Sequence, residues 1–85
     1  MTFRASRRTL DSGGLMRRYR IDSSAITSLG YDPSNRLLEL EFVTGAVYDY
    51  EGVPPEEVLA MLESDSRGRY FDMHIRGPYP YRRIA

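Results

Sequence analysis

The sequence predicts a small α+β domain, in which a three-stranded antiparallel meander carries one or two helices on one face, behind a disordered basic arm. Three observations lead to this prediction. Apolar and acidic residues alternate over residues 38–43 and again over 46–51, as in strands that bury one face. A glycine turn joins these two segments. Two prolines then end the second segment and begin a helix that has an apolar stripe.

The domain organisation follows from length and composition. A chain of 85 residues has room for one hydrophobic core. Residues 1–20 are polar and basic and show neither a strand nor a helix period, so we expect a disordered arm followed by one domain over residues 21–85. Met16 lies directly before the patterned region, which makes it a candidate for the true initiator in place of Met1.

Composition also bears on the compartment. The chain contains no cysteine, which excludes a disulfide framework and fits a reducing environment. No apolar run approaches the ~20 residues that span a bilayer, and the arginine-bearing N-terminus lacks the apolar region of a signal peptide. We therefore expect a cytoplasmic protein with no membrane partner.

The first strand is expected within residues 24–31, which are rich in β-forming residues and are followed by the turn cluster Asp-Pro-Ser-Asn at 32–35. Its apolar residues Ile26 and Leu29 are three apart and cannot share one face of a regular strand. Either a bulge near Ser28 re-aims one of them, or the strand begins after Ile26.

The register of the second hairpin depends on the length of its turn. A two-residue loop at 44–45 would set Leu40 opposite Asp49. A three-residue loop over 43–45, with Gly45 left-handed in a bulge, matches the apolar faces and is our prediction. It places Glu39 directly across from Asp49, a like-charge pair that costs a few tenths of a kcal/mol (~0.2–1) unless a cation covers it. The predicted apolar pairs are Phe42 with Ala46, Leu40 with Tyr48, and Leu38 with Tyr50.

The helices come after the meander. Pro55 suits the first turn of a helix whose apolar stripe, Val58, Met61 and Leu62, packs on the sheet. The sequence SDSRG at 64–68 breaks this helix, and Ser66 can cap a second one with a stripe of Tyr70 or Phe71, His74 and Ile75. Gly77 and Pro78 end the second helix, and the tail PYPYRRIA is expected to lie extended across the domain.

A family resemblance rests on several short motifs in order: SSAITSLGYD, LELEF, TGAVYDYEGVP and SRGRYF, followed by a tail with Ile, Arg and Tyr. Together they resemble the KTSC domain, which is found after some lysyl-tRNA synthetases and as free-standing small bacterial proteins. The central Tyr-x-Tyr motif of that family matches Tyr48-Asp49-Tyr50 here, and the resemblance spans residues 23–84. It implies an RNA-binding role through the synthetase connection, and it carries over no catalytic residues.

Motifs for enzyme chemistry do not occur in this chain. There is no phosphate-binding loop, dinucleotide fingerprint or nucleophile elbow. His74 is the only histidine, and we interpret it as a packing residue. The acidic residues of the meander have oxygen ligands for a divalent cation, but a solvated face or one neutralised by arginine is the preferred interpretation. The acidic residues in question are Glu39, Glu41, Asp49 and Glu51. We expect no enzyme activity, no cofactor and no metal.

The distribution of charge leads to two functional hypotheses. Net charge is +5 over residues 1–20, −9 over 21–66 and +4 over 67–85, and every cation is an arginine. The first hypothesis is a module that binds RNA or tRNA, with guanidinium groups on phosphates and tyrosine rings under bases. Tyr48 and Tyr50 are assigned to the core in this interpretation. The expected contact residues are Arg67, Arg69, Arg76, Tyr79, Tyr81, Arg82 and Arg83.

The second hypothesis is a protein-interaction or accessory domain. It would use the first or third strand as an exposed sheet edge, or pair with itself, while its arginines neutralise the acidic middle of the chain. The position of the C-terminal arginines separates the two hypotheses. Convergence into one exposed patch favours RNA, and placement across the acidic sheet face favours the structural role.

Overall fold

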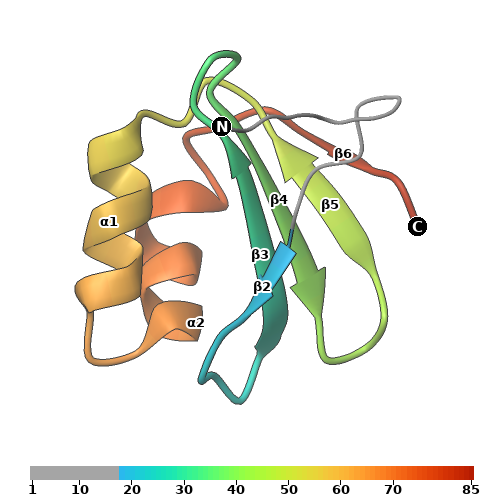
Figure 1. Cartoon of the computed structure of the whole chain (residues 1–85). Coiled ribbons are helices and arrows are strands. Elements are labelled where there is room, and N and C mark those ends of the chain that lie inside the picture. The colour runs from blue at the N-terminus through green and yellow to red at the C-terminus, as the bar shows by residue number, and fades with distance from the viewer. Residues whose placement is uncertain (1–17) are drawn as a thin grey trace.

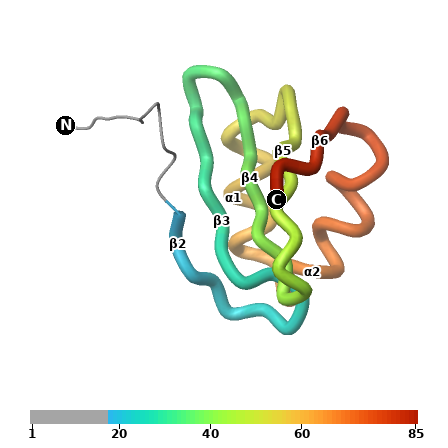
Figure 2. Tube along the Cα trace, turned by 90° about the vertical axis from the view of Figure 1, so that its right-hand side faces the viewer, coloured from blue at the N-terminus to red at the C-terminus, as the bar shows by residue number. Residues whose placement is uncertain are grey.

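A computed structural model describes residues 18–85 and confirms an α+β fold with an antiparallel sheet and helices on one face (Figure 1). The sheet has five strands in the order β2-β3-β4-β5-β6. In Figure 2 the sheet lies in front of the helices, so no helix of residues 18–85 lies on its opposite face. The elements are β2 (Arg18–Arg20), β3 (Ile26–Asp32), β4 (Leu37–Phe42), β5 (Val47–Tyr50), α1 (Pro55–Glu63), α2 (Arg67–Tyr70), its π-helical continuation η1 (Phe71–Ile75) and β6 (Tyr81–Arg83).

The prediction of three strands was wrong, because a short strand is added at each edge of the meander. β2 pairs with β3, and the extended tail forms β6 beside β5. Residues 18–20 therefore do not belong to a disordered arm, and residues 1–17 lie outside the described part of the chain. The second hypothesis assumed that the first and third strands of the meander are the edges of the sheet, and this assumption is consequently wrong. A three-residue strand is too short to show a period of two, so neither addition could be detected as a pattern.

The bulge in the first strand is present. The register of β3 against β4 shifts between Ile26 and Ser28, which sets Ile26 opposite Phe42 and Leu29 opposite Leu40. Both Ile26 and Leu29 are buried in the core. The extra residue of the bulge thus lets Ile26 and Leu29, which are three residues apart, both face the core. The alternative of a strand that begins after Ile26 is wrong.

The predicted register of the second hairpin is confirmed. Leu40 pairs with Tyr48 and Leu38 with Tyr50, and the Phe42 amide donates to the Ala46 carbonyl at 2.9 Å. Gly45 closes the three-residue loop at φ +96°, a left-handed conformation that side chains disfavour, and its amide donates to the Phe42 carbonyl at 2.8 Å. This register puts Glu39 opposite Asp49.

The helices cover the apolar face of the sheet, but fewer residues of α1 face the core than predicted. Val58 and Met61 of α1 are buried, but Leu62 is 38% exposed, so its assignment to the core was wrong. Phe71 and Ile75 of η1 complete the roof over the sheet. Ser66 caps α2 by accepting a hydrogen bond from the Arg69 amide at 3.2 Å, as predicted.

His74 lies on the solvent side of the second helical segment. It is exposed, and its ring packs on Tyr70 with centroids 4.3 Å apart, so its place in the core stripe was wrong. Within residues 18–85, none of the helices is long and apolar enough to cross a membrane.

Candidate functional site

The two faces of the sheet carry different chemistry, because side chains alternate along each strand. On the face without helices, one row crosses all five strands in register. On the face with helices, the aromatic residues of β5 and β6 lie side by side. The row on the helix-free face consists of Arg18, Gly30, Glu39, Asp49 and Arg82.

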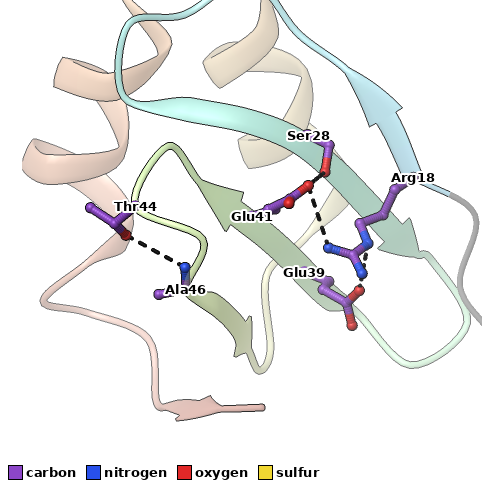
Figure 3. A network of polar contacts seen from close by, with 6 residues as sticks. All are labelled: Arg18, Ser28, Glu39, Glu41, Thr44 and Ala46. Carbon is purple, nitrogen blue, oxygen red and sulfur yellow. Dashed lines mark hydrogen bonds and ion pairs between the residues drawn. The ribbon is translucent and has the colours of Figure 1, made fainter. Parts of the chain in front are cut away.

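The acidic face is neutralised from the N-terminal side, as the close-up in Figure 3 shows. The Nε atom of Arg18 lies 3.0 Å from Oε2 of Glu39, and its Nη1 lies 3.8 Å from Oε1 of Glu41. The Ser28 hydroxyl donates to the same Glu41 oxygen at 2.8 Å. The sequence left open a solvated face or one neutralised by an arginine of the C-terminal third. The ion pairs with Glu39 and Glu41 come from Arg18, while Arg82 of the C-terminal third is the register partner of Asp49.

Glu39 and Asp49 form a buried carboxyl pair. The Glu39 side chain is 12% exposed and Asp49 is 8% exposed. Burial raises the pKa of Glu39 to about 7, a hydrogen bond to Asp49 and the charge of Asp49 act in the same direction, and Arg18 lowers it. The Oδ1 atom of Asp49 has no hydrogen-bond partner among the described residues. The Glu39 carboxyl therefore changes its protonation near neutral pH.

The acidic quartet does not assemble into a metal centre in the part of the chain described here. Over residues 18–85, no three His, Cys, Asp or Glu side chains are grouped so that they could hold a metal ion. The guanidinium of Arg18 instead occupies the position beside Glu39 and Glu41 where a cation would compensate their charge.

The helix-bearing face carries a cluster of five aromatic rings. Phe71 of η1 contacts Phe42 and Tyr50, with centroids 5.3 and 5.2 Å apart. Tyr81 of β6 contacts Tyr48 at 5.6 Å and Tyr50 at 5.8 Å. Tyr50 is buried and Tyr48 is half-buried, whereas Tyr81 is 61% exposed. The cluster thus runs from the core to an open aromatic surface at the β6 edge.

Two arginines accompany this surface. Arg83 is the register partner of Tyr48 and shares its face, because it lies two residues after Tyr81. Burial raises the pKa of Tyr50 to about 12, with Tyr48 acting in the same direction, and the charge of Arg76 opposes them. Arg76 is exposed and pairs with Asp72 of its own helical segment at 2.6 Å. We name Tyr48, Tyr81, Arg76 and Arg83 the aromatic–arginine face.

The other predicted contact residues lie elsewhere. Arg82 points to the opposite face of the sheet, where it is the register partner of Asp49. Arg67 and Arg69 lie on α2, where Nη1 of Arg67 donates to the Ser64 carbonyl at 2.8 Å. Of the seven predicted residues, Tyr81 and Arg83 share one face of β6, and Arg76 lies near enough to Tyr50 to lower its pKa. The C-terminal arginines neither converge into one patch nor all cross the acidic face.

Tyr79 has a structural partner. Its hydroxyl donates to Oε1 of Glu57 at 2.9 Å, and the hydroxyl of Tyr70 donates to the other oxygen of the same carboxylate. This junction joins α1 to α2 and to the segment that leads into β6. The hydrogen bond from Tyr70, followed by burial, raises the pKa of Tyr70 to about 12.

Sequence reasoning missed two members of these surfaces. Arg18 was placed in the arm, although Gly30, which has no side chain, lies between it and Glu39 in the row and leaves room for it to reach the carboxylate. Tyr48 was assigned to the core, although its neighbour in the sheet is an exposed strand. Neither feature leaves a signal in the sequence without knowledge of β2 and β6.

These features define a small α+β domain with one helix-covered aromatic face and one charged face. The KTSC domain matches residues 22–79, and the chain belongs to the KTSC domain family. The crystal structure of a KTSC domain protein from Yersinia pestis is similar, with a TM-score of 0.79 and 41% sequence identity, over 84% of this chain and 100% of that chain. The resemblance noted from the motifs is therefore confirmed.

The relatives include free-standing proteins and parts of larger ones. An uncharacterised protein of Stutzerimonas stutzeri is 52% identical over 67 residues, which cover 79% of this chain and 93% of the relative. A lysine–tRNA ligase of Nostoc sp. is 31% identical over 64 residues, which cover 75% of this chain and 11% of the ligase. The description of the matched family names no catalytic activity. Both edge strands, β2 and β6, lie outside the residues matched by the family.

Proposed function

We propose that this protein is a non-enzymatic module that binds unpaired segments of RNA through the aromatic–arginine face. The observation that carries the proposal is the exposed ring of Tyr81, which contacts the half-buried Tyr48 and is followed by Arg83 on the same face. Exposed aromatic rings beside arginines are the means by which proteins hold single-stranded nucleic acid. The similarity to part of a lysine–tRNA ligase supports RNA as the polyanion.

The ring geometry favours one stacked base. The centroids of Tyr48 and Tyr81 are 5.6 Å apart and the rings are tilted by 52°, which leaves no parallel slot between them. A base would therefore stack on the solvent side of Tyr81, and such stacking contributes about 1–3 kcal/mol. Arg83 and Arg76 would meet the adjacent phosphates. For Arg76 this means exchanging Asp72, an exposed ion pair that contributes at most about 1 kcal/mol.

The test is a titration of fluorescently labelled single-stranded RNA and tRNA at low salt, followed by anisotropy. Two phosphate contacts on a single strand predict that log affinity falls against log salt with a slope of about 1.4. Tyr81→Ala should weaken binding about 5- to 100-fold, and Tyr81→Phe, which keeps the ring, should retain it. Arg83→Gln should weaken binding, while the matched control Arg69→Gln, an exposed arginine of α2, should not.

Two outcomes would contradict the proposal. Absence of binding to either RNA at low salt would remove RNA as the ligand. Equal losses for Arg83→Gln and Arg69→Gln, with none for Tyr81→Ala, would show diffuse charge attraction in place of a site on this face.

The second candidate function, protein interaction through a sheet edge, now concerns β2 and β6. Every residue of both strands is exposed, and among residues 18–85 no further strand lies beside β6. However, Arg82 and Arg83 project from opposite faces of β6, and adjacent like charges oppose pairing of this edge with a second copy. Light scattering should therefore find a monomer. A dimer that Arg82→Glu disrupts would favour this second function over RNA binding.

A further inference from the structure

The edge strand β2 lies on the sheet with all three of its residues exposed, so none of them belongs to the buried core. Its attachment includes main-chain pairing with β3 and the ion pairs that Arg18 makes across Gly30 with Glu39 and Glu41. The closer of these two ion pairs, to Glu39 at 3.0 Å, involves a carboxyl group that Asp49 faces directly from β5.

We propose that the Glu39–Asp49 pair is a pH-sensitive latch for strand β2: the ionised pair holds Arg18 and with it the strand, and the protonated pair loosens it. The latch lies on the helix-free face of the sheet, opposite the aromatic–arginine face, and the strand that it holds, β2, is at the other edge from β6; the proposal therefore does not depend on the proposed RNA site. A loosened β2 uncovers the main-chain groups of β3.

The groups that face Glu39 can be named from every strand. β2 contributes Arg18, with Arg20 in the next row, and β3 contributes Gly30 and the Ser28 hydroxyl. β4 contributes Glu41. β5 contributes Asp49, and the exposed Glu51 lies two residues further along the chain. Arg82 of β6 lies opposite Asp49. Glu41 accepts from Ser28 and lies 3.8 Å from Arg18, so it keeps part of the hold when Glu39 is neutral.

Proton and arginine compete for the same carboxylate, which fixes the sign of the effect. Arg18 lowers the pKa of Glu39, and by linkage the ionisation of Glu39 must strengthen the attachment of Arg18 to the same extent. Because burial and Asp49 raise the pKa of Glu39 to about 7, the change falls near neutral pH, well above the range of an ordinary glutamate. The attachment of β2 therefore becomes stronger as pH rises from about 6 to 8.

Amide hydrogen exchange of the full chain, measured by NMR from pH 6 to 8 and corrected for intrinsic rates, tests the latch. The opening equilibrium of the β2–β3 amides should fall up to about fivefold with rising pH, which corresponds to the upper range of an exposed ion pair. The amides of β4 and β5 serve as the internal reference. Glu39→Gln, which keeps the shape of the side chain but cannot ionise, should abolish the pH dependence.

Two further variants separate the latch from a general effect of charge. Arg18→Gln should increase opening at pH 8, remove the pH dependence and raise the pKa of Glu39 as followed by carbon NMR. Asp49→Asn should lower that pKa, because it removes the facing charge. An opening equilibrium that does not change with pH in the unmodified protein, or that changes equally in Arg18→Gln, would overturn the proposal.

Discussion

Replacing Glu39 with glutamine should change how the stability of the whole domain depends on pH. The pKa of Glu39 is raised from 4.5 to about 7 in the folded state, mainly by burial. A raised pKa means that the contribution of this group to the free energy of unfolding is complete below about pH 4.5 and is lost as pH rises through about 7. The unmodified protein should therefore be less stable at pH 8 than at pH 5.

The size of the effect follows from the shift. One pKa unit corresponds to about 1.4 kcal/mol, so the full shift would amount to about 3 kcal/mol. The 12% exposure of the side chain and the nearby solvent-accessible Arg18 reduce this figure, and we expect about 1–2 kcal/mol. Glutamine resembles the protonated acid, so Glu39→Gln should match the unmodified protein at pH 5 and exceed its stability by that amount at pH 8.

Urea denaturation at half-unit steps from pH 5 to 8 measures this difference, provided that the slope against urea stays constant. Glu63→Gln, at an exposed glutamate of α1, is the matched control for the removal of one negative charge. Parallel stability curves for Glu39→Gln and the unmodified protein, or a loss of stability in Glu39→Gln at pH 8, would refute the reasoning. The local attachment of β2 is predicted to change in the opposite direction over this range, so the two measurements are distinguished by the sign of their pH dependence.

Two other substitutions test the turn and the tyrosine junction. Gly45→Ala should lower the free energy of unfolding by about 1–2 kcal/mol in urea denaturation, because φ +96° is strained for alanine although nothing lies within 4 Å of the added carbon; an unchanged stability would mean that the loop relaxes to another turn. Tyr79→Phe should cost about 1–2 kcal/mol by removing the hydrogen bond to Glu57, without changing RNA affinity. A lost affinity at full stability would instead place Tyr79 in the binding site.

The hairpin of β4 and β5 could be predicted because its constraints are local. Apolar and acidic residues alternate over 38–42 and 48–51, and only one loop length matches the apolar faces of the two strands. Gly45 supplies the left-handed residue that this loop requires. The bulge of β3 could be predicted as one of two alternatives for a similar reason, because Ile26 and Leu29 are both apolar and both are buried in the core. The exposed position of Leu62 could not be predicted, because the space beside Met61 is filled by Phe71 and Ile75 from a segment later in the chain.

The edge strands could not be predicted because the partner determines them. Residues 18–20 and 81–83 contain arginine and tyrosine without any apolar alternation, and all six are exposed. They become strands because the buried β3 and β5 offer unpaired main-chain groups that must find hydrogen bonds. The position of Arg18 also depends on the neighbouring strands. Its ion pair with Glu39 reaches across Gly30, a residue without a side chain on the strand between them.

The candidate site shows why a cluster of charges in a sequence does not make a charged patch on a surface. Arg82 and Arg83 are adjacent, and counting charge over residues 67–85 treats them as one basic group. In a strand, consecutive side chains point to opposite faces, so Arg82 is set against Asp49 while Arg83 joins Tyr48 and Tyr81. The extended pairing of β6 with β5 thus places Arg82 beside the acidic row and Arg83 beside the proposed RNA surface. A phosphate-binding role can accordingly be tested at Arg83 alone, with Arg82 as the neighbouring control that shares its strand but not its face.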